Sequence, residues 1–276
     1  MKPRLVAQVV SVSLLVMLCL ALSAPFIWMV LISLHPPKAS IPPMNEIVPK
    51  QVHWDNYRLV LTIPELPVAR FFLNSLFVTL AVVMGQVFVS SLAAYGFAKT
   101  KFRGREQLFA AFILSMMFGG TVTQIPVFLL MRELNWLDTY LALIVPGLSS
   151  AFSIFLLRQF FMQIPNELSE AAKMDGASEF RVYWSVVMPL SKAALATASA
   201  FTFFAVWTDF FWPLLSTSSV QMRTLEVGLS VFKNSYGGTN WSMQMAAAVI
   251  VLAPLVAVFL LTQRFFVKGI TMGGIK

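Results

Sequence analysis

Residues 71–98 read FFLNSLFVTLAVVMGQVFVSSLAAYGFA, a run without one Asp, Glu, Lys or Arg. A helix needs about 20 apolar residues to cross the hydrocarbon core of a bilayer, so this run is long enough to span a membrane. Across all 276 residues, 58% are hydrophobic, 12% are charged and the mean hydropathy is +0.77. A soluble domain carries about twice that share of charged residues. The sequence therefore predicts an integral membrane protein and excludes a disordered chain.

Other apolar segments bring the prediction to six transmembrane helices in one all-α transmembrane domain, residues 1–276. The predicted spans are 6–33, 72–98, 107–131, 139–161, 190–215 and 243–266. The first span contains Ala-Leu-Ser-Ala at 21–24, so a cleaved signal peptide is the alternative there. Because the uncharged run continues past Val30, which is longer than a signal peptide requires, we expect a retained span.

The basic residues predict the orientation of these spans. One side of the membrane receives the N-terminus, segments 98–106 and 158–192, and the C-terminus, with 13 Lys and Arg residues against 7 on the other side. Cytoplasmic loops carry the excess of Lys and Arg, so both termini are predicted to be cytoplasmic. The net charge of +8 thus has a topological explanation, and no basic stripe indicates nucleic-acid binding.

Few residues offer chemistry of their own. The single cysteine, Cys19, lies in an apolar run, and His35 and His53 have no partner at metal-ligand spacing, so we predict neither a disulfide nor a metal site. No catalytic constellation is present, which argues against an enzyme. The sequence contains no Gly-Lys dipeptide, and without the phosphate-binding loop that needs one the chain is not expected to bind ATP itself.

The segment 162–189 carries the most information. Residues 164–189 read IPNELSEAAKMDGASEFRVYWSVVMP. Asn166 is a suitable N-cap, and Gly176 can adopt the left-handed conformation that ends a helix, which predicts a short helix of about ten residues. Glu170 and Lys173 are spaced to pair on that helix. On these grounds alone, the segment is an amphipathic connector.

A second short helix is expected after Gly176. Apolar residues recur there at helical spacing and predict one apolar face; they are Phe180, Tyr183, Trp184, Val187 and Met188. Pro189 is expected to open the fifth span, because proline is tolerated in the first turn of a helix. The predicted result is a helix–glycine–helix projection at the cytoplasmic surface.

This projection resembles the cytoplasmic coupling loop of ABC importer permeases, in which Glu-Ala-Ala is followed by Gly and, further on, Pro. Here these residues are Glu170-Ala171-Ala172, Gly176 and Pro189. Further stretches are similar to the maltose-type smaller permease subunit of the carbohydrate-uptake branch; they are Asn74-Ser75-Leu76, residues 93–98, residues 102–105, Trp207-x-Asp209-Phe210 and the C-terminal residues 266–276.

The resemblance implies a multi-pass permease subunit in a bacterial or archaeal cell membrane. Such a subunit forms half of a pore with a second homologous permease, an external solute-binding protein delivers a sugar or oligosaccharide, and a dimer of ATPase subunits binds the ATP, so no cofactor is expected on this chain. By the resemblance, the ATPase-coupling residues are Glu170, Ala171, Ala172, Asp175, Gly176 and Pro189.

Four polar residues of the spans are candidates for the translocation pathway. Gly119, Gly120 and Pro126 predict a break in the third span, and irregular backbone in a bilayer lines a cavity or is buried in protein. Thr121 and Gln124 at this break, and Gln86 in the second span, therefore either line the pathway or join helices. Asp209 is either a residue of the external gate or an interfacial acid flanked by Trp207 and Trp212 in an aromatic belt.

Tyr236 and Trp241, in the outer segment 216–242, either contact the binding protein or anchor at the interface. Two other functions remain open. One is the import of a polyol or glycerol phosphate by the same machinery. The other is an ion-coupled secondary transporter. Proton relays need ionisable residues within the membrane, and Asp209 is the single acid of the predicted spans, so the sequence disfavours this function.

Overall fold

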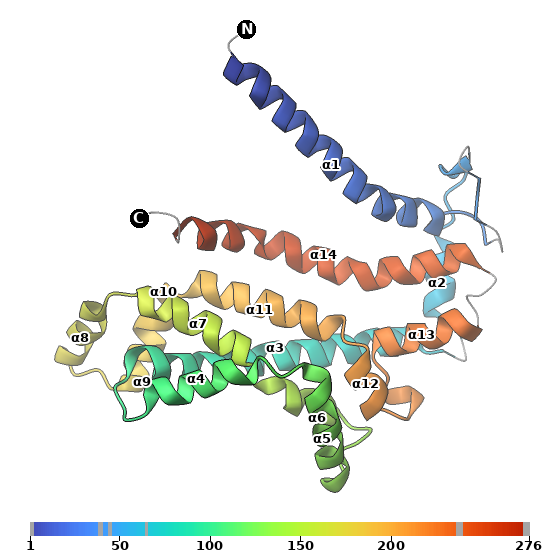
Figure 1. The fold of residues 1–276 in the computed structure, drawn as a ribbon. Coiled ribbons are helices and arrows are strands. Elements are labelled where there is room, and N and C mark those ends of the chain that lie inside the picture. The colour runs from blue at the N-terminus through green and yellow to red at the C-terminus, as the bar shows by residue number, and fades with distance from the viewer. Residues whose placement is uncertain (1–2, 38–40, 44–45, 64–65, 236–239, 273–276) are drawn as a thin grey trace. The chain divides into compact units, whose positions relative to one another are not determined.

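A computed structural model describes residues 3–272 apart from 38–40, 44–45, 64–65 and 236–239, and every regular element in these ranges is a helix (Figure 1). The all-α prediction is confirmed. The chain divides into two compact units, which are described separately. One comprises Met1–Ala69 with Gly228–Pro254, and the other comprises Arg70–Val227 with Leu255–Lys276.

The first unit contains α1 (Pro3–Ser33) and α2 (Asp55–Leu61), together with most of α13 (Leu225–Ser235) and the first part of α14 (Trp241–Met272). The last carbonyls of a helix have no partner within it. Here the amide nitrogen of Asn56 on α2 donates to the carbonyls of Ser33 and His35, at 2.8 and 2.7 Å, and so satisfies the end of α1.

The second unit contains the elements from α3 to η4 and includes residues 162–189, the predicted coupling segment. In chain order its elements are α3 (Val68–Lys99), α4 (Arg105–Ser115), α5 (Gly120–Glu133), α6 (Tyr140–Ile144), the 3-10 turn η2 (Val145–Leu148), α7 (Ala151–Gln163), α8 (Asn166–Met174), α9 (Glu179–Val182), the π-helical turn η3 (Tyr183–Val187), α10 (Met188–Leu190), α11 (Lys192–Trp207), α12 (Phe211–Ser216) and the 3-10 turn η4 (Val220–Met222).

The main core of this unit lies where α3, α7 and α11 meet the turn η3. Small residues on α3 and α11 allow these helices to approach the aromatic and aliphatic side chains of α7 and η3 closely, as in other packed membrane helices. The cluster consists of Ala94, Tyr95, Leu157, Phe161, Tyr183, Val187, Ala194 and Ala198, all buried. The elements around the coupling segment are therefore packed against the longest helix of the unit.

The third predicted span, 107–131, is not one helix. The structure has α4, of 11 residues, and α5, of 14 residues, with a break at 116–119. The prediction of a break at the glycine pair is confirmed: Gly119 has an extended backbone and Gly120 begins α5. Pro126 lies inside α5 without ending it. Neither helix alone is long enough to cross a bilayer.

Four helices of the described residues are long and apolar enough to cross a membrane: Val10–Ser33, Val68–Lys99, Tyr140–Gln163 and Trp241–Phe265. A fifth span would be the pair Glu179–Leu190 and Lys192–Trp207, which bends by 81°. These segments agree with five of the predicted spans. The count of six remains a prediction, because the third span is divided.

The fifth predicted span, 190–215, is not one helix, because α11 ends at Trp207 and α12 begins at Phe211. Pro189 lies inside the short helix α10, and α11 starts at Lys192, after the bend at Ser191. The backbone leaves helical geometry at Ser191, which has φ −99° and ψ 16°, and α10 is separated from α11 there. The placement of Pro189 as the first turn of the fifth span was therefore wrong by one short helix.

Candidate functional site

The coupling segment is built around a glycine turn. Gly176 has φ +83°, the left-handed conformation that glycine adopts without steric cost. Its N–H donates to the carbonyl of Lys173 at 2.9 Å, and the N–H of Ala177 donates to the carbonyl of Ala172 at 3.0 Å. This pair of bonds is the Schellman arrangement, which satisfies the last carbonyls of α8 and turns the chain sharply. The predicted end of the first short helix is confirmed.

The start of α8 differs from the prediction. Pro165, not Asn166, occupies the cap position, and the Asn166 side chain makes no cap hydrogen bond. Instead the side-chain oxygen of Asn166 accepts a hydrogen bond of 2.8 Å from the ammonium group of Lys99, which also donates to the carbonyl of Ile164. Lys99 is the last residue of α3, so this contact joins the second span to the entrance of the coupling segment.

A second contact joins α3 to the other side of the glycine turn. The hydroxyl of Tyr95 donates to one carboxylate oxygen of Glu179 at 2.8 Å, and the ammonium group of Lys173 donates to the other. The predicted Glu170–Lys173 pair is not formed, because Lys173 reaches across the turn to Glu179. Glu170 therefore stays exposed without a partner among the described contacts.

The predicted apolar face after Gly176 is divided. Tyr183 and Val187 are buried in the core, and the hydroxyl of Tyr183 bonds to that of Ser91 on α3 at 2.8 Å. Phe180 and Trp184 are exposed instead, and their rings stack at 6.5 Å. The turn η3 is wound as a π-helix, which shifts residues away from the spacing of an α-helix. Of the five predicted residues, Tyr183 and Val187 therefore lie in the core and the partly buried Met188 packs against it.

The residues predicted to contact an ATPase are at the surface. Glu170, Ala171, Asp175, Gly176 and Pro189 are exposed and Ala172 is half-buried. Met174 is 88% exposed, and with Phe180 and Trp184 it adds apolar surface to the segment. Aromatic and methionine side chains are enriched at protein interfaces, so these three exposed residues make the segment a candidate docking surface.

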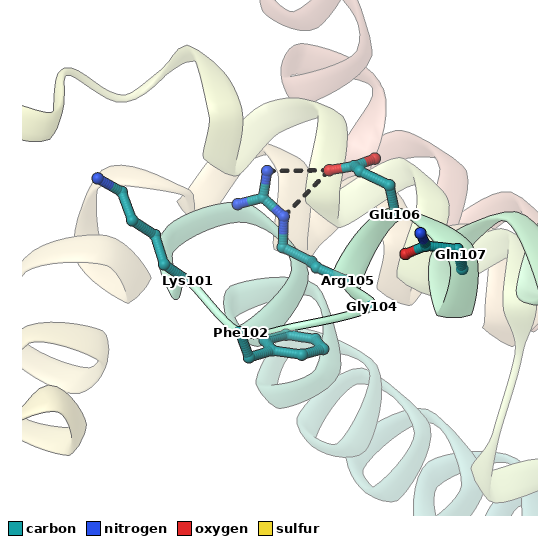
Figure 2. A pocket seen from close by; sticks show the side chains of 6 residues that line it. All are labelled: Lys101, Phe102, Gly104, Arg105, Glu106 and Gln107. Atoms are coloured by element: carbon teal, nitrogen blue, oxygen red, sulfur yellow. Dashed lines mark hydrogen bonds and ion pairs between the residues drawn. The ribbon is translucent and has the colours of Figure 1, made fainter.

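Two cavities lie near the end of α3 and the start of α4, and the larger is also lined by residues of the segment 162–189. The larger, of about 560 Å³, is lined by residues that include Tyr95, Lys99, Glu170, Lys173 and Glu179. The smaller, of about 460 Å³, is shown in Figure 2, where the guanidinium of Arg105 is joined to the carboxylate of Glu106; it is lined by Lys101, Phe102, Gly104, Arg105, Glu106 and Gln107. Glu170 thus shares the larger cavity with Lys99, Lys101, Arg105 and Lys173, as well as with Glu179.

Comparison with known proteins shows which family this chain belongs to. The family model described as "binding-protein-dependent transport system inner membrane component" matches residues 7–272. The chain belongs to this family. It is a multi-pass permease component of a binding-protein-dependent ABC importer, as the coupling-loop resemblance implied.

Relatives and a solved structure agree with the family. The chain is 40% identical over 205 residues to the sn-glycerol-3-phosphate transport system permease protein UgpE of Yersinia enterocolitica, covering 74% of this chain and 73% of the relative. It is 32% identical over 231 residues to the arabinooligosaccharides transport system permease protein AraQ of Bacillus subtilis, covering 84% and 82%.

A chain from the crystal structure of a bacterial ABC transporter involved in the import of the acidic polysaccharide alginate superposes with a TM-score of 0.82 at 23% identity. The match covers 96% of this chain and 98% of the solved one. At that identity the likeness shows a shared fold.

Among the predicted pathway residues of this permease, Gln86 is held between three helices. Its amide nitrogen donates to the hydroxyls of Ser153 on α7 and Thr202 on α11, at 2.8 and 2.7 Å, and all three side chains are buried. These bonds are those expected if Gln86 joins helices, which was the alternative to its lining the pathway. A role of Gln86 in the pathway remains a prediction.

The other pathway candidates on α5 differ from Gln86. Gln124 is half-buried, and its side-chain oxygen has no hydrogen-bond partner within the part of the chain that the structure describes. Thr121 lies in the first turn of α5, and its side chain is outside the described residues. Pathway lining by both is thus still a prediction.

Asp209 caps a helix. Its Oδ1 accepts hydrogen bonds from the backbone N–H groups of Phe211 and Trp212, at 3.1 and 3.3 Å, at the start of α12. The aromatic belt expected beside it is wrong: Trp207 and Trp212 are both buried, and the indole N–H of Trp212 donates to the carbonyl of Ala142. In the outer segment, Trp241 begins α14 half-buried, whereas Tyr236 lies outside the described residues.

An aspartate that the sequence did not single out joins two predicted outer loops. Asp138, in the turn before α6, has φ +59°, and its Oδ1 accepts from the N–H groups of Ser218 and Ser219 and from the hydroxyl of Ser219, each at 3.0 Å. Partial burial raises the pKa of this carboxyl, but the hydrogen bonds from the two serines outweigh it and leave the pKa below the usual 3.8.

The hydrogen bonds of Asp138 predict that the thermal stability of the protein depends on pH. Because the folded pKa of Asp138 is lowered, its contribution to stability is complete above the unfolded value of about 4 and is lost as the pH falls through the lower folded value. We expect the Tm of the wild type in detergent to fall more than that of Asp138→Asn between pH 6 and pH 3. The asparagine tolerates the same backbone conformation and keeps one acceptor. Parallel curves for the two proteins would contradict the prediction.

Proposed function

We propose that this chain is the permease subunit of a carbohydrate ABC importer, with six spans in one transmembrane domain and both termini in the cytoplasm of a bacterial or archaeal cell. It forms half of the pore with a second homologous permease. An external solute-binding protein delivers a sugar or oligosaccharide, and a pair of ATPase subunits binds and hydrolyses the ATP. The chain itself holds no cofactor.

The observation that carries this proposal is the exposed turn of α8 and Gly176, held to α3 by Lys99 and Tyr95. Glu170 is exposed on α8, with no hydrogen bond or ion pair to another of the described residues, and it lines a cavity that Lys and Arg side chains also line. A docking element transmits force only if it is fixed to the helices that must move. The contacts of Asn166 and Glu179 supply that attachment on both sides of the turn.

The carbohydrate substrate is supported by the relatives' names. One is named for arabino-oligosaccharides and another for glycerol 3-phosphate, both polyhydroxylated compounds. Import of a polyol or glycerol phosphate is therefore the alternative within the same machinery. Comparing radiolabelled arabino-oligosaccharide and glycerol 3-phosphate in cells that express the complete transporter separates the two, because only the true substrate accumulates in an ATP-dependent manner.

Purification of the tagged chain in mild detergent tests the machinery. We expect an ATPase and a second permease to co-purify with the wild type and with Glu133→Lys, a matched charge reversal on the exposed end of α5. Glu170→Lys is expected to lose the ATPase while keeping the second permease. If the wild type purifies alone and transports in liposomes without ATP, the proposal is overturned in favour of an ion-coupled carrier.

A further inference from the structure

A buried arginine lies close to the point where α7 leads into the coupling segment. Arg158 is only 6% exposed, although arginine is seldom buried without partners. Its Nε donates to the carbonyl of Phe97 on α3 at 3.2 Å, and its Nη2 donates to both carboxylate oxygens of Glu106 on α4, each at 3.0 Å. The guanidinium carbon lies 3.8 Å from the centre of the Phe109 ring, also on α4.

These contacts join three helices at one side chain. Arg158 lies five residues before the end of α7 at Gln163, and only Ile164 and Pro165 separate α7 from α8. About 8 Å of helix separates Arg158 from the end of α7. Lys99 bonds both the carbonyl of Ile164 and the side chain of Asn166, so the short linker to α8 is held at both of its ends. On the other side, Glu106 is in the first turn of α4, which leads to the break at 116–119 and to α5.

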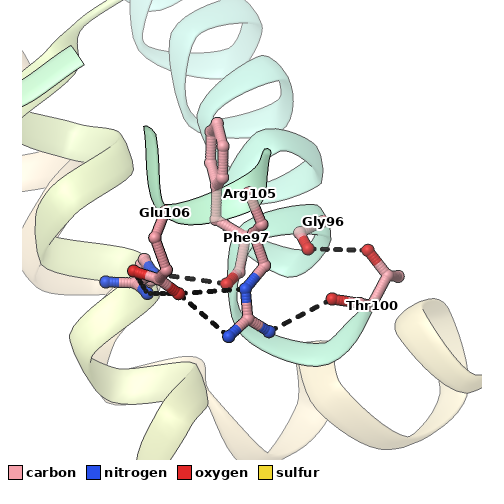
Figure 3. Close-up of polar contacts among 6 residues, drawn as sticks. Gly96, Phe97, Thr100, Arg105 and Glu106 are labelled. Carbon is pink, nitrogen blue, oxygen red and sulfur yellow. Dashed lines mark hydrogen bonds and ion pairs between the residues drawn. The ribbon is translucent and has the colours of Figure 1, made fainter. Parts of the chain in front are cut away.

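The α4 end of this link is held in place by further polar contacts. Arg105 bonds to Glu106 and donates to the carbonyl of Thr100, and the hydroxyl of Thr100 donates to the carbonyl of Gly96 (Figure 3). The carboxylate of Glu106 is thus shared by two arginines. Although the Glu106 side chain is 60% exposed, these contacts restrict its carboxylate to a position between the two guanidinium groups.

The ion pair is not what holds α4 in the fold. Phe97, Phe109 and Ile154 form a buried cluster of α3, α4 and α7, with Ala93, Phe112 and Ile113 packed against it. Because this apolar packing remains when Glu106 is neutralised, α4 is expected to stay in place without the ion pair. Loss of the pair should therefore alter how motion is transmitted more than whether the permease folds.

We propose that Arg158 is a positioning residue that transmits movement of α8 to α4 through Glu106, and so to the broken third span with Thr121 and Gln124. This inference rests on the proposed function, because it assumes that an ATPase moves α8. Neither residue touches substrate or nucleotide in this scheme. Their role is to make the third span move together with the coupling segment during transport.

The test uses the complete importer with its ATPase and binding protein in proteoliposomes. Glu106→Gln removes the charge at nearly constant shape, and Arg158→Lys keeps a charge but loses the second donor direction. We expect each variant to assemble and to hydrolyse ATP within about twofold of the wild type, while sugar taken up per ATP falls roughly tenfold, the scale of mutations that alter coupling. Glu133→Gln, an exposed acid on α5, is the matched control and should behave as the wild type.

A double variant distinguishes transmission from simple damage. If Arg158 and Glu106 act as one link, Glu106→Gln with Arg158→Lys should be no worse than the more impaired single variant. Unchanged uptake per ATP in both single variants overturns the inference, and so does a joint loss of assembly, hydrolysis and uptake, which indicates a structural role. If the wild-type complex contains no ATPase, the proposed function itself fails, and this result is distinct from either outcome.

Discussion

Substituting Gly176 by leucine is expected to reduce uptake to below about a tenth of the wild-type rate, while the permease is still inserted and still binds the second permease. A side chain at φ +83° costs about 1–2 kcal/mol, which is too little to unfold the chain. Apart from the two neighbouring residues, none of the described residues has an atom within 4 Å of the position that a Cβ would occupy, so no clash adds to this cost. The damage arises because the leucine both disfavours the turn and projects from the docking surface.

The matched control is Gly176→Asn. Asparagine adopts the left-handed conformation more readily than other residues with side chains, so this variant should keep the turn and a substantial share of uptake. Uptake by whole cells and co-purification of the ATPase are measured for both variants. Normal transport by Gly176→Leu would show that α8 is not the coupling element, whatever the family of the chain.

Of the substitutions proposed above and below, truncating Tyr183 to alanine is expected to produce the largest loss of stability. Tyr183 is 1% exposed and lies in the core of α3, α7 and α11, with its ring 5.4 Å from that of Tyr95. Removing a buried aromatic side chain costs about 3–5 kcal/mol, through lost packing and the cavity left behind. We expect a clear decrease in the Tm of the detergent-solubilised protein and a parallel loss of uptake, because the turn η3 loses its anchor.

Tyr183→Phe separates packing from hydrogen bonding at this position. It keeps the ring and removes only the bond to Ser91, which is worth about 1 kcal/mol. Its Tm should therefore lie much closer to that of the wild type than to that of Tyr183→Ala. Equal decreases for the two variants would mean that the hydroxyl pair, and not the packed ring, holds η3 to α3.

Structural features that depend only on residues adjacent in the sequence were predictable from the sequence. The apolar runs located the long helices, because their length and lack of charge are set by the bilayer itself. The glycine pair at 119–120 indicated the break between α4 and α5, and Gly176 indicated the end of α8. In each case the backbone conformation follows from the residue at that position and its immediate neighbours.

Other local predictions failed where a distant residue competed for the same group. Asn166 was expected to cap α8, but Lys99 takes its side-chain oxygen. Lys173 was expected to pair with Glu170, but Glu179 lies across the turn and is also bound by Tyr95. Spacing along a helix describes which side chains can meet, and it cannot say which of several possible partners is nearest in the folded chain.

By itself the sequence determined the long apolar helices and the glycine turn that ends α8, since hydrophobic length and left-handed glycine are local properties. Membership of the permease family followed from the resemblance of residues 164–189 and not from these properties. Only the tertiary structure decided how that turn is held. Tyr95 meets Glu179 across 84 positions of the chain, Lys99 meets Asn166 across 67, and Arg158 meets Glu106 across 52. Such pairs form because the packing of α3, α4 and α7 brings charged and polar groups together where partial burial favours their pairing.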